Sequence, residues 1–97
     1  MRTYTLKNAN LASQYFQRWK PTAASIARLN VKTRAVYLNE TNPKQVLAII
    51  EFRDEDDPAS TIAKYTSSED FKQDLGELDM TAFEGVESVT LAPLNLE

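Results

Sequence analysis

The chain carries one short acidic stretch whose residue types are suited to metal binding or acid–base chemistry. EFRDEDDP, residues 51–58, places five carboxylates in eight residues directly after the hydrophobic run VLAII. A calcium or magnesium site needs carboxylates that converge on one point, and this stretch lacks the glycine and the later acidic ligand of an EF-hand loop. Adjacent acids at a loop are mostly solvated, which disfavours a raised pKa. We therefore interpret the stretch as a strand end followed by a helix N-terminus, and predict no metal site.

The amino-acid composition excludes much of the remaining chemistry. The chain has neither cysteine nor histidine. Disulfides, thiol nucleophiles, Ser-His-Asp triads and histidine-ligated zinc or haem are therefore excluded. Any reaction would have to proceed without a protein-held metal or a cofactor, so we expect no cofactor.

The charge of −3 is unevenly distributed along the sequence. Residues 1–50 carry eight Lys or Arg side chains against one Glu, a net +7, whereas residues 51–97 carry three basic against thirteen acidic side chains, a net −10. The basic residues are spread over some forty positions without aromatic interleaving, so we do not expect nucleic-acid binding. Instead, we expect the two halves to pack against each other, or across a dimer, as complementary surfaces.

Length and hydropathy indicate one small domain. The 97 residues suit a single domain spanning 1–97, with a core modest enough that self-association is plausible. No apolar run approaches the roughly 20 residues that cross a bilayer, and the N-terminus MRTYTLKN lacks the apolar core of a secretory signal. We expect a cytoplasmic protein that does not associate with membranes.

Hydrophobic periodicity and turn residues predict the order β-α-β-β-α-β. The predicted elements are a strand at 2–7, a helix at 11–29 with a kink or restart at Pro21, strands at 31–38 and 45–53, a helix after Pro58, a second helix start at Ser68, and a strand at 86–91 that Pro93 ends.

Two βα crossovers around a hairpin give a ferredoxin-like α+β fold, with a four-stranded antiparallel sheet and both helices on one face. The run VLAII is apolar on both sides, which is typical of a central strand whose second face does not meet water. A second copy of the same sheet would cover that face, so we expect a homodimer.

Arg34 and Glu51 are candidates for a charged pair on the same side of the sheet. They fall in the middle of the second predicted strand and at the end of the third. If both side chains lie on the face without helices, they form an ion pair or an anion-binding arginine inside a barrel. The alternative is a solvent-exposed cross-strand pair, worth less than about 1 kcal/mol.

Four stretches together resemble the dimeric α/β-barrel superfamily, which includes antibiotic-biosynthesis monooxygenase-like, NIPSNAP-like and stress-responsive barrel domains. They cover nearly the whole chain and are RTYTLK, QYFQRW, AVYLNETNPKQVLAIIEFRD, and KYTSSEDFKQDL with VESVTLAPL. The resemblance implies sheets paired face to face into a barrel, often with an exchanged C-terminal arm, and a small-molecule pocket between sheet and helices. The histidines used by haem-binding members are missing here, so the resemblance does not imply haem.

The resemblance also implies candidate site residues. Trp19 would line a pocket for an aromatic or polyketide-like substrate, with Tyr37, Arg34 and Glu51 as further ligand-binding residues, and Tyr4 or Tyr65 would bond a phenolic or quinone oxygen. The implied activity is ligand binding, or monooxygenase-like or isomerase-like catalysis without a cofactor. The alternative is a non-catalytic, stress-related or interaction homodimer in which Trp19 is simply part of the core.

Overall fold

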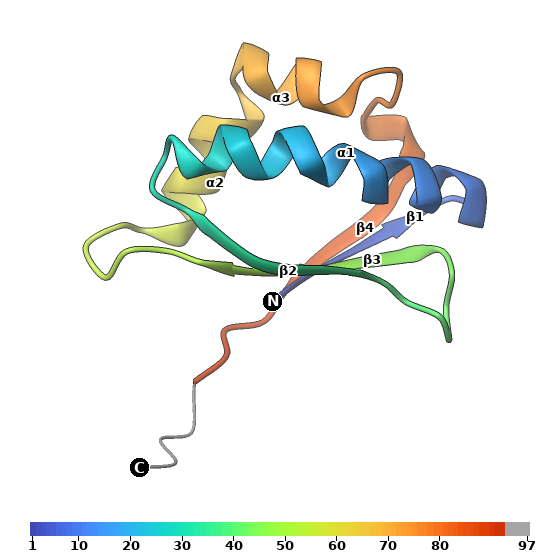
Figure 1. Cartoon of the computed structure of the whole chain (residues 1–97), viewed down its shortest axis with the longest axis horizontal. Helices are drawn as coiled ribbons and strands as arrows, with labels where there is room; N and C mark the ends of the chain where they lie inside the picture. The colour runs from blue at the N-terminus through green and yellow to red at the C-terminus, as the bar shows by residue number, and fades with distance from the viewer. Residues whose placement is uncertain (93–97) are drawn as a thin grey trace.

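The computed structural model describes residues 1–92, which form a four-stranded sheet with a layer of helices on one side (Figure 1). The elements follow the predicted order, and the second helical segment is divided near Ser68, where the sequence predicted a new helix start. In chain order they are β1 (Arg2–Leu6), α1 (Ala9–Ala27), β2 (Lys32–Leu38), β3 (Gln45–Glu51), α2 (Pro58–Thr66), α3 (Glu69–Leu75), the 3-10 turn η1 (Met80–Ala82) and β4 (Phe83–Ser88).

All neighbouring strands pair antiparallel, in the order β2-β3-β1-β4. This arrangement confirms the predicted α+β class and antiparallel sheet, and it is consistent with a ferredoxin-like fold. β3 lies inside the sheet between β2 and β1, as its two-sided apolar sequence indicated. The β2–β3 hairpin closes through a turn in which the Asn39 side chain accepts hydrogen bonds from the backbone of Thr41 and Asn42.

The first helix is one continuous element, whereas Pro21 led us to expect a kink or a restart. The Asn8 side chain caps it by accepting from the Leu11 backbone N–H at 2.8 Å. A proline removes only one backbone hydrogen bond. The same helix face buries Trp19 and Ile26 on either side of the proline, and this packing holds the helix together. The chain then reverses at Asn30, which adopts φ 64°.

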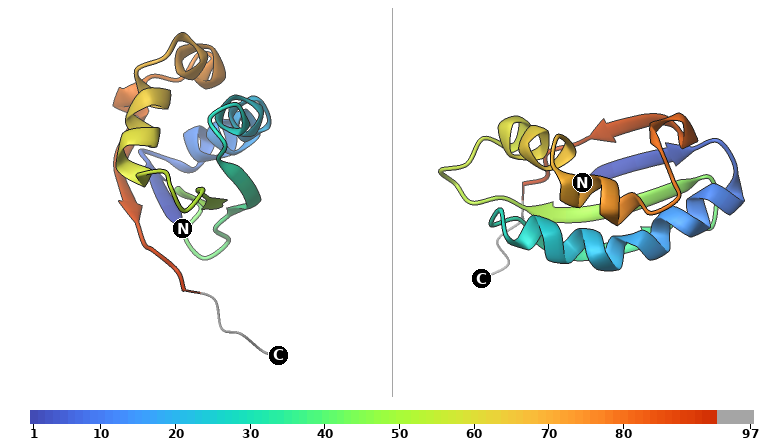
Figure 2. Two further views of the ribbon diagram at one scale, coloured as in Figure 1. Left: turned by 90° about the vertical axis from the view of Figure 1, so that its left-hand side faces the viewer. Right: turned by 90° about the horizontal axis from the view of Figure 1, so that it is seen from above.

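The two short helices begin where the sequence placed their caps. The Asp57 side chain accepts from the Ser60 backbone N–H ahead of α2, and the Ser68 hydroxyl accepts from the Phe71 N–H ahead of α3. Pro58 occupies the first turn of α2, where a missing N–H costs nothing. The break at residues 67–68 lets α3 run beside α1 above the sheet (Figures 1 and 2).

The last strand was predicted wrongly by three residues. It spans Phe83–Ser88 instead of 86–91, and Gly85 lies within it. Its register with β1 sets this position, because β1 pairs Leu6 with Phe83 and Arg2 with Ser88. Pro93, the predicted strand end, lies outside the described residues.

The core lies between the helices and one face of the sheet. Leu6, Val46 and Ala48 point from the strands toward the helices and are fully buried. Ion pairs also join the basic and acidic halves of the chain, as expected, at Arg28–Asp70 (2.9 Å) and Lys44–Glu84 (3.8 Å). The opposite face of the sheet carries no helix (Figure 1), and we call it the open face.

Candidate functional site

A cavity of about 90 Å³ lies between the helix-facing side of the sheet and the helices. Its walls are almost wholly apolar, and they come from β1, β3, β4, η1 and all three helices. The lining includes Tyr4, Tyr15, Trp19, Tyr65, Phe71 and Phe83. Met80 and Val86 also line it and are 58% and 42% exposed, so they mark its rim.

Four of the lining aromatic rings pack against one another edge to face. Tyr15 contacts Phe83 at 4.9 Å and Tyr4 at 5.1 Å between ring centroids, and Trp19 lies 6.0 Å from Tyr4. Edge-to-face pairs of this kind stabilise a structure beyond the area that they bury. The cluster fixes the ring positions on one wall of the cavity.

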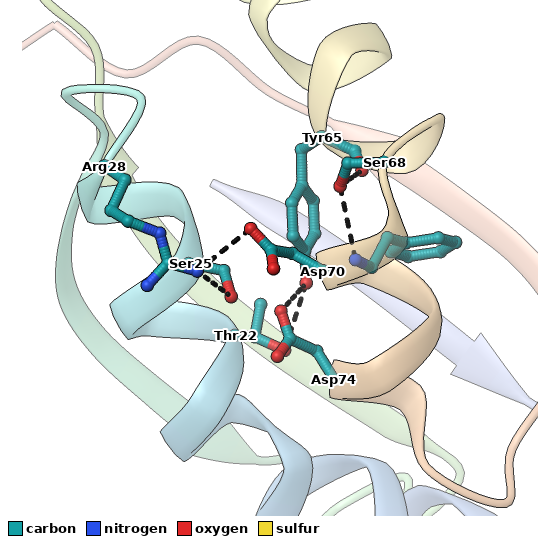
Figure 3. A network of polar contacts seen from close by, with 8 residues as sticks. Thr22, Ser25, Arg28, Tyr65, Ser68, Asp70 and Asp74 are labelled. Atoms are coloured by element: carbon teal, nitrogen blue, oxygen red, sulfur yellow. Dashed lines mark hydrogen bonds and ion pairs between the residues drawn. The ribbon is translucent and has the colours of Figure 1, made fainter.

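Tyr65, which lines the cavity, belongs to a buried polar group (Figure 3). The Tyr65 hydroxyl donates to the Asp74 carboxylate at 2.7 Å and lies 3.5 Å from the Thr22 hydroxyl. Asp74 is only 6% exposed, and its own backbone carbonyl accepts from the Arg18 side chain at 2.6 Å. Burial raises the pKa of Tyr65 above its ordinary value, and the Asp74 carboxylate raises it further. Tyr65 is therefore held neutral, with its proton directed at Asp74.

The aromatic cluster also contains the polar ends of Tyr15, Trp19 and Tyr4. Burial raises the pKa of Tyr15 well above its ordinary value. Tyr4 raises this pKa further, whereas the Trp19 indole lowers it. The Trp19 indole N–H nevertheless meets no acceptor in hydrogen-bond geometry within residues 1–92. The Arg2 side chain donates to the Tyr4 hydroxyl at 2.8 Å and to the Ser88 hydroxyl at 2.8 Å.

The structure divides the four predicted site residues between two faces of the sheet. Trp19 lines the cavity and is 4% exposed. Tyr37 pairs with Leu47 on the open face and is 58% exposed. Arg34 and Glu51 form an ion pair of 2.9 Å with both side chains about half exposed, and the guanidinium lowers the pKa of Glu51. Within one chain, these three residues do not reach the Trp19 cavity.

A bulge in β2 explains how Arg34 reaches Glu51. Thr33 pairs with Ile50 and Ala35 pairs with Ile49, so Arg34 is the extra residue between them. Regular alternation would have placed Arg34 on the helix side with Val36. The bulge breaks that alternation and lets the guanidinium meet Glu51.

The sequence reasoning missed Tyr15 and Thr22 as cavity residues, and Asp74 as the acceptor of the Tyr65 hydrogen bond. One face of α1 was marked by residue spacing, because buried residues recur there at intervals of four, three and four: Tyr15, Trp19, Thr22 and Ile26. No comparable signal marks Asp74, which is one of several acids along an otherwise solvated segment. Its burial follows from the packing of α3 beside α1.

The acidic stretch serves a structural role at the corner between β3 and α2. Arg53 forms ion pairs with Asp56 at 2.9 Å and Glu55 at 3.4 Å, and Asp57 caps α2. Across the described part of the chain, no three acidic side chains come together in a way that would hold a metal ion. In the same residues, no helix combines the length and apolarity needed to cross a membrane.

Comparison with protein-family models, curated protein sequences and solved structures gives no match to this chain. A shared fold by itself does not define an activity. The cavity and the open face are therefore the two structural features that bear on function.

The buried phenols predict a loss of stability at alkaline pH. Because the pKa values of Tyr15 and Tyr65 are higher in the folded chain than in the unfolded chain, the free energy of unfolding falls as the pH rises past about 10. Each tyrosine contributes about 1 kcal/mol to this fall by pH 11. Tyr65→Phe should flatten the profile of urea unfolding between about pH 9 and 11.

The exposed Tyr37→Phe is the matched control for this profile. Trp19 fluorescence reports the unfolding, since the chain has one tryptophan. An unchanged slope in both Tyr15→Phe and Tyr65→Phe would contradict the assignment of the two buried phenols.

Proposed function

We propose that this protein binds a small aromatic molecule in the cavity between its sheet and its helices. The observation that carries the proposal is the composition of the cavity wall, which is almost wholly apolar and includes the rings of Tyr4, Trp19 and Tyr65. Such a wall suits an aromatic ligand, because aromatic rings pack favourably against one another.

The resemblance to cofactor-independent oxygenases supplies the candidate reaction for such a ligand. The electrons come from the substrate: a phenol and O₂ give a quinone and water, with the aromatic ring oxidised and dioxygen reduced. In this scheme the cavity walls exclude bulk water, and the aromatic rings of Trp19 and Tyr65 pack against the ligand.

Ligand binding should raise the melting temperature. At a phenol concentration ten times Kd, the stabilisation is about 1.4 kcal/mol, or roughly 6–10 °C for a chain of this size. Val86→Phe narrows the rim of the cavity and should abolish the shift. Val89→Phe adds the same group at an exposed position that does not line the cavity, so it should keep the shift. An equal shift in both variants would contradict binding in this cavity.

Oxygen consumption separates an enzyme from a binding protein. With phenol in air, a monooxygenase-like activity consumes one O₂ for each quinone formed. An oxygen electrode and quinone absorbance measure the two quantities together. Thermal stabilisation without oxygen uptake above that of Val86→Phe would assign the protein to ligand binding alone.

The second candidate function is that of a non-catalytic homodimer. The cavity volume favours it, because about 90 Å³ is well below the roughly 300–1,000 Å³ of pockets that hold drug-sized ligands. Under this proposal the aromatic cluster is core. The protein then acts through association as a stress-related or interaction protein.

Both candidates share the proposal of a homodimer formed through the open face. Tyr37, Leu47, Ile49 and Ala35 form adjacent cross-strand pairs there, which leaves apolar side chains of β2 and β3 without a helix above them. The segment after β4 leaves the sheet on this side (Figure 1) and exposes Val89 and Leu91. Face-to-face pairing of two sheets would bury these groups.

Charge on the open face should prevent this pairing. Ile49→Glu is expected to reduce the mass measured by light scattering after size exclusion from twice 11.0 kDa to 11.0 kDa. Ala24→Glu places the same charge on the exposed surface of α1 and should leave the dimer intact. A wild-type monomer at micromolar concentration would contradict the homodimer.

A further inference from the structure

Among the described residues, Arg2 is the one charged residue that lines the cavity. The register of β1 with β4 pairs Arg2 with Ser88 and Tyr4 with Val86. Arg2 therefore lies one cross-strand pair away from Val86, which marks the rim and is 42% exposed. The Arg2 side chain is itself partly exposed. A positive charge thus stands where the apolar cavity meets solvent.

The Arg2 guanidinium is held against the aromatic wall by three contacts. Its Nε donates to the Tyr4 hydroxyl at 2.8 Å, and its Nη1 donates to the Ser88 hydroxyl at 2.8 Å. Its Cζ lies 5.4 Å from the centroid of the Tyr4 ring. That ring packs in turn against Tyr15 and Trp19, which also line the cavity. The charge and the aromatic wall are therefore close enough for one small molecule to contact both.

No acidic side chain pairs with Arg2 within residues 1–92. Ion pairs hold three other arginines of this part of the chain: Arg28, Arg34 and Arg53. The neighbouring acid on β4, Glu87, pairs with Thr3 and so belongs to the open face. A guanidinium has five N–H donors, and the two bonds to hydroxyl groups use only two of them. The remaining donors are available to an anion.

We infer that the ligand is an aromatic monocarboxylate, whose ring enters the cavity while its carboxylate binds Arg2 at the rim. A carboxylate matches the planar fork of a guanidinium. A volume of about 90 Å³ limits the buried part to about one aromatic ring. The charged group stays at the partly exposed rim, where its desolvation costs little. This inference rests on the proposed binding function and narrows it to ligands of the benzoate type.

Three probes test the inference on the whole chain at neutral pH by titration calorimetry. Benzoate carries the ring and the charge, benzamide keeps the ring without the charge, and acetate keeps the charge without the ring. Benzoate should bind about tenfold more tightly than benzamide, because a charge-assisted hydrogen bond is stronger than a neutral one. Acetate should bind more weakly than either. Added salt should weaken the binding of benzoate and leave that of benzamide unchanged.

Matched arginine variants locate the carboxylate. Arg2→Met removes the charge at the rim and should bring the ratio of benzoate to benzamide affinity to near one. Benzamide binding by the same variant reports that the cavity is intact. Arg34→Met removes an arginine that does not line the cavity, so it should keep the wild-type ratio. The salt dependence of the wild type tests the same contact without relying on the folding of a variant.

The outcomes separate this inference from the proposed function. Benzamide binding the wild type as tightly as benzoate would overturn the inference and leave binding in the cavity standing. Acetate binding as tightly as benzoate would also overturn it, because the ring would then contribute nothing. Failure of benzoate, benzamide and phenol to bind would overturn both the inference and the proposed function.

Discussion

The fold is governed by one constraint: its interior strand β3 is apolar on both sides, and the helices within residues 1–92 cover only one face of the sheet. β3 shows this most directly. Val46 and Ala48 are fully buried under the helices, whereas Leu47 and Ile49 alternate onto the open face. Burial of apolar surface stabilises the packing of the helix face. The apolar β2–β3 part of the open face is the surface of the proposed homodimer, and the helix face contains the cavity of the proposed binding function.

The helix face is covered unevenly. α1 lies over β2 and β3, while α3 packs on α1 rather than on the sheet. The helix side of β1 and β4 is consequently covered by aromatic side chains from several elements. Because rigid rings do not fill the volume between these elements completely, a cavity remains. The cavity and the partly exposed Val86 are consequences of this arrangement.

Burying tyrosine and tryptophan also buries their polar ends, and the chain treats these ends differently. The Tyr65 hydroxyl is satisfied by Asp74 at the cost of burying a carboxylate, which a purely structural core would avoid. The Trp19 N–H meets no acceptor in the described part of the chain. The aromatic residues around the cavity are the basis of the proposed ligand binding.

Local sequence signals predicted the elements well. Asn8, Asp57 and Ser68 cap helices as their side-chain chemistry indicates, because a cap depends only on residues a few positions away. Predictions failed where a distant segment decides the outcome. The position of β4 is set by its register with β1, and α1 continues through Pro21 because the packing of its buried face holds it together.

The sequence by itself determined the classes of chemistry that are excluded, the order of the elements, and the central place of β3. Only the tertiary structure decided which side chains share a site. Strand side chains alternate with a period of two, so one bulge changes the face that a residue occupies, as Arg34 shows. The cavity likewise joins Tyr4, Trp19 and Tyr65 from three elements far apart in the chain. No local pattern encodes that meeting, because it is set by how the helices settle on the sheet.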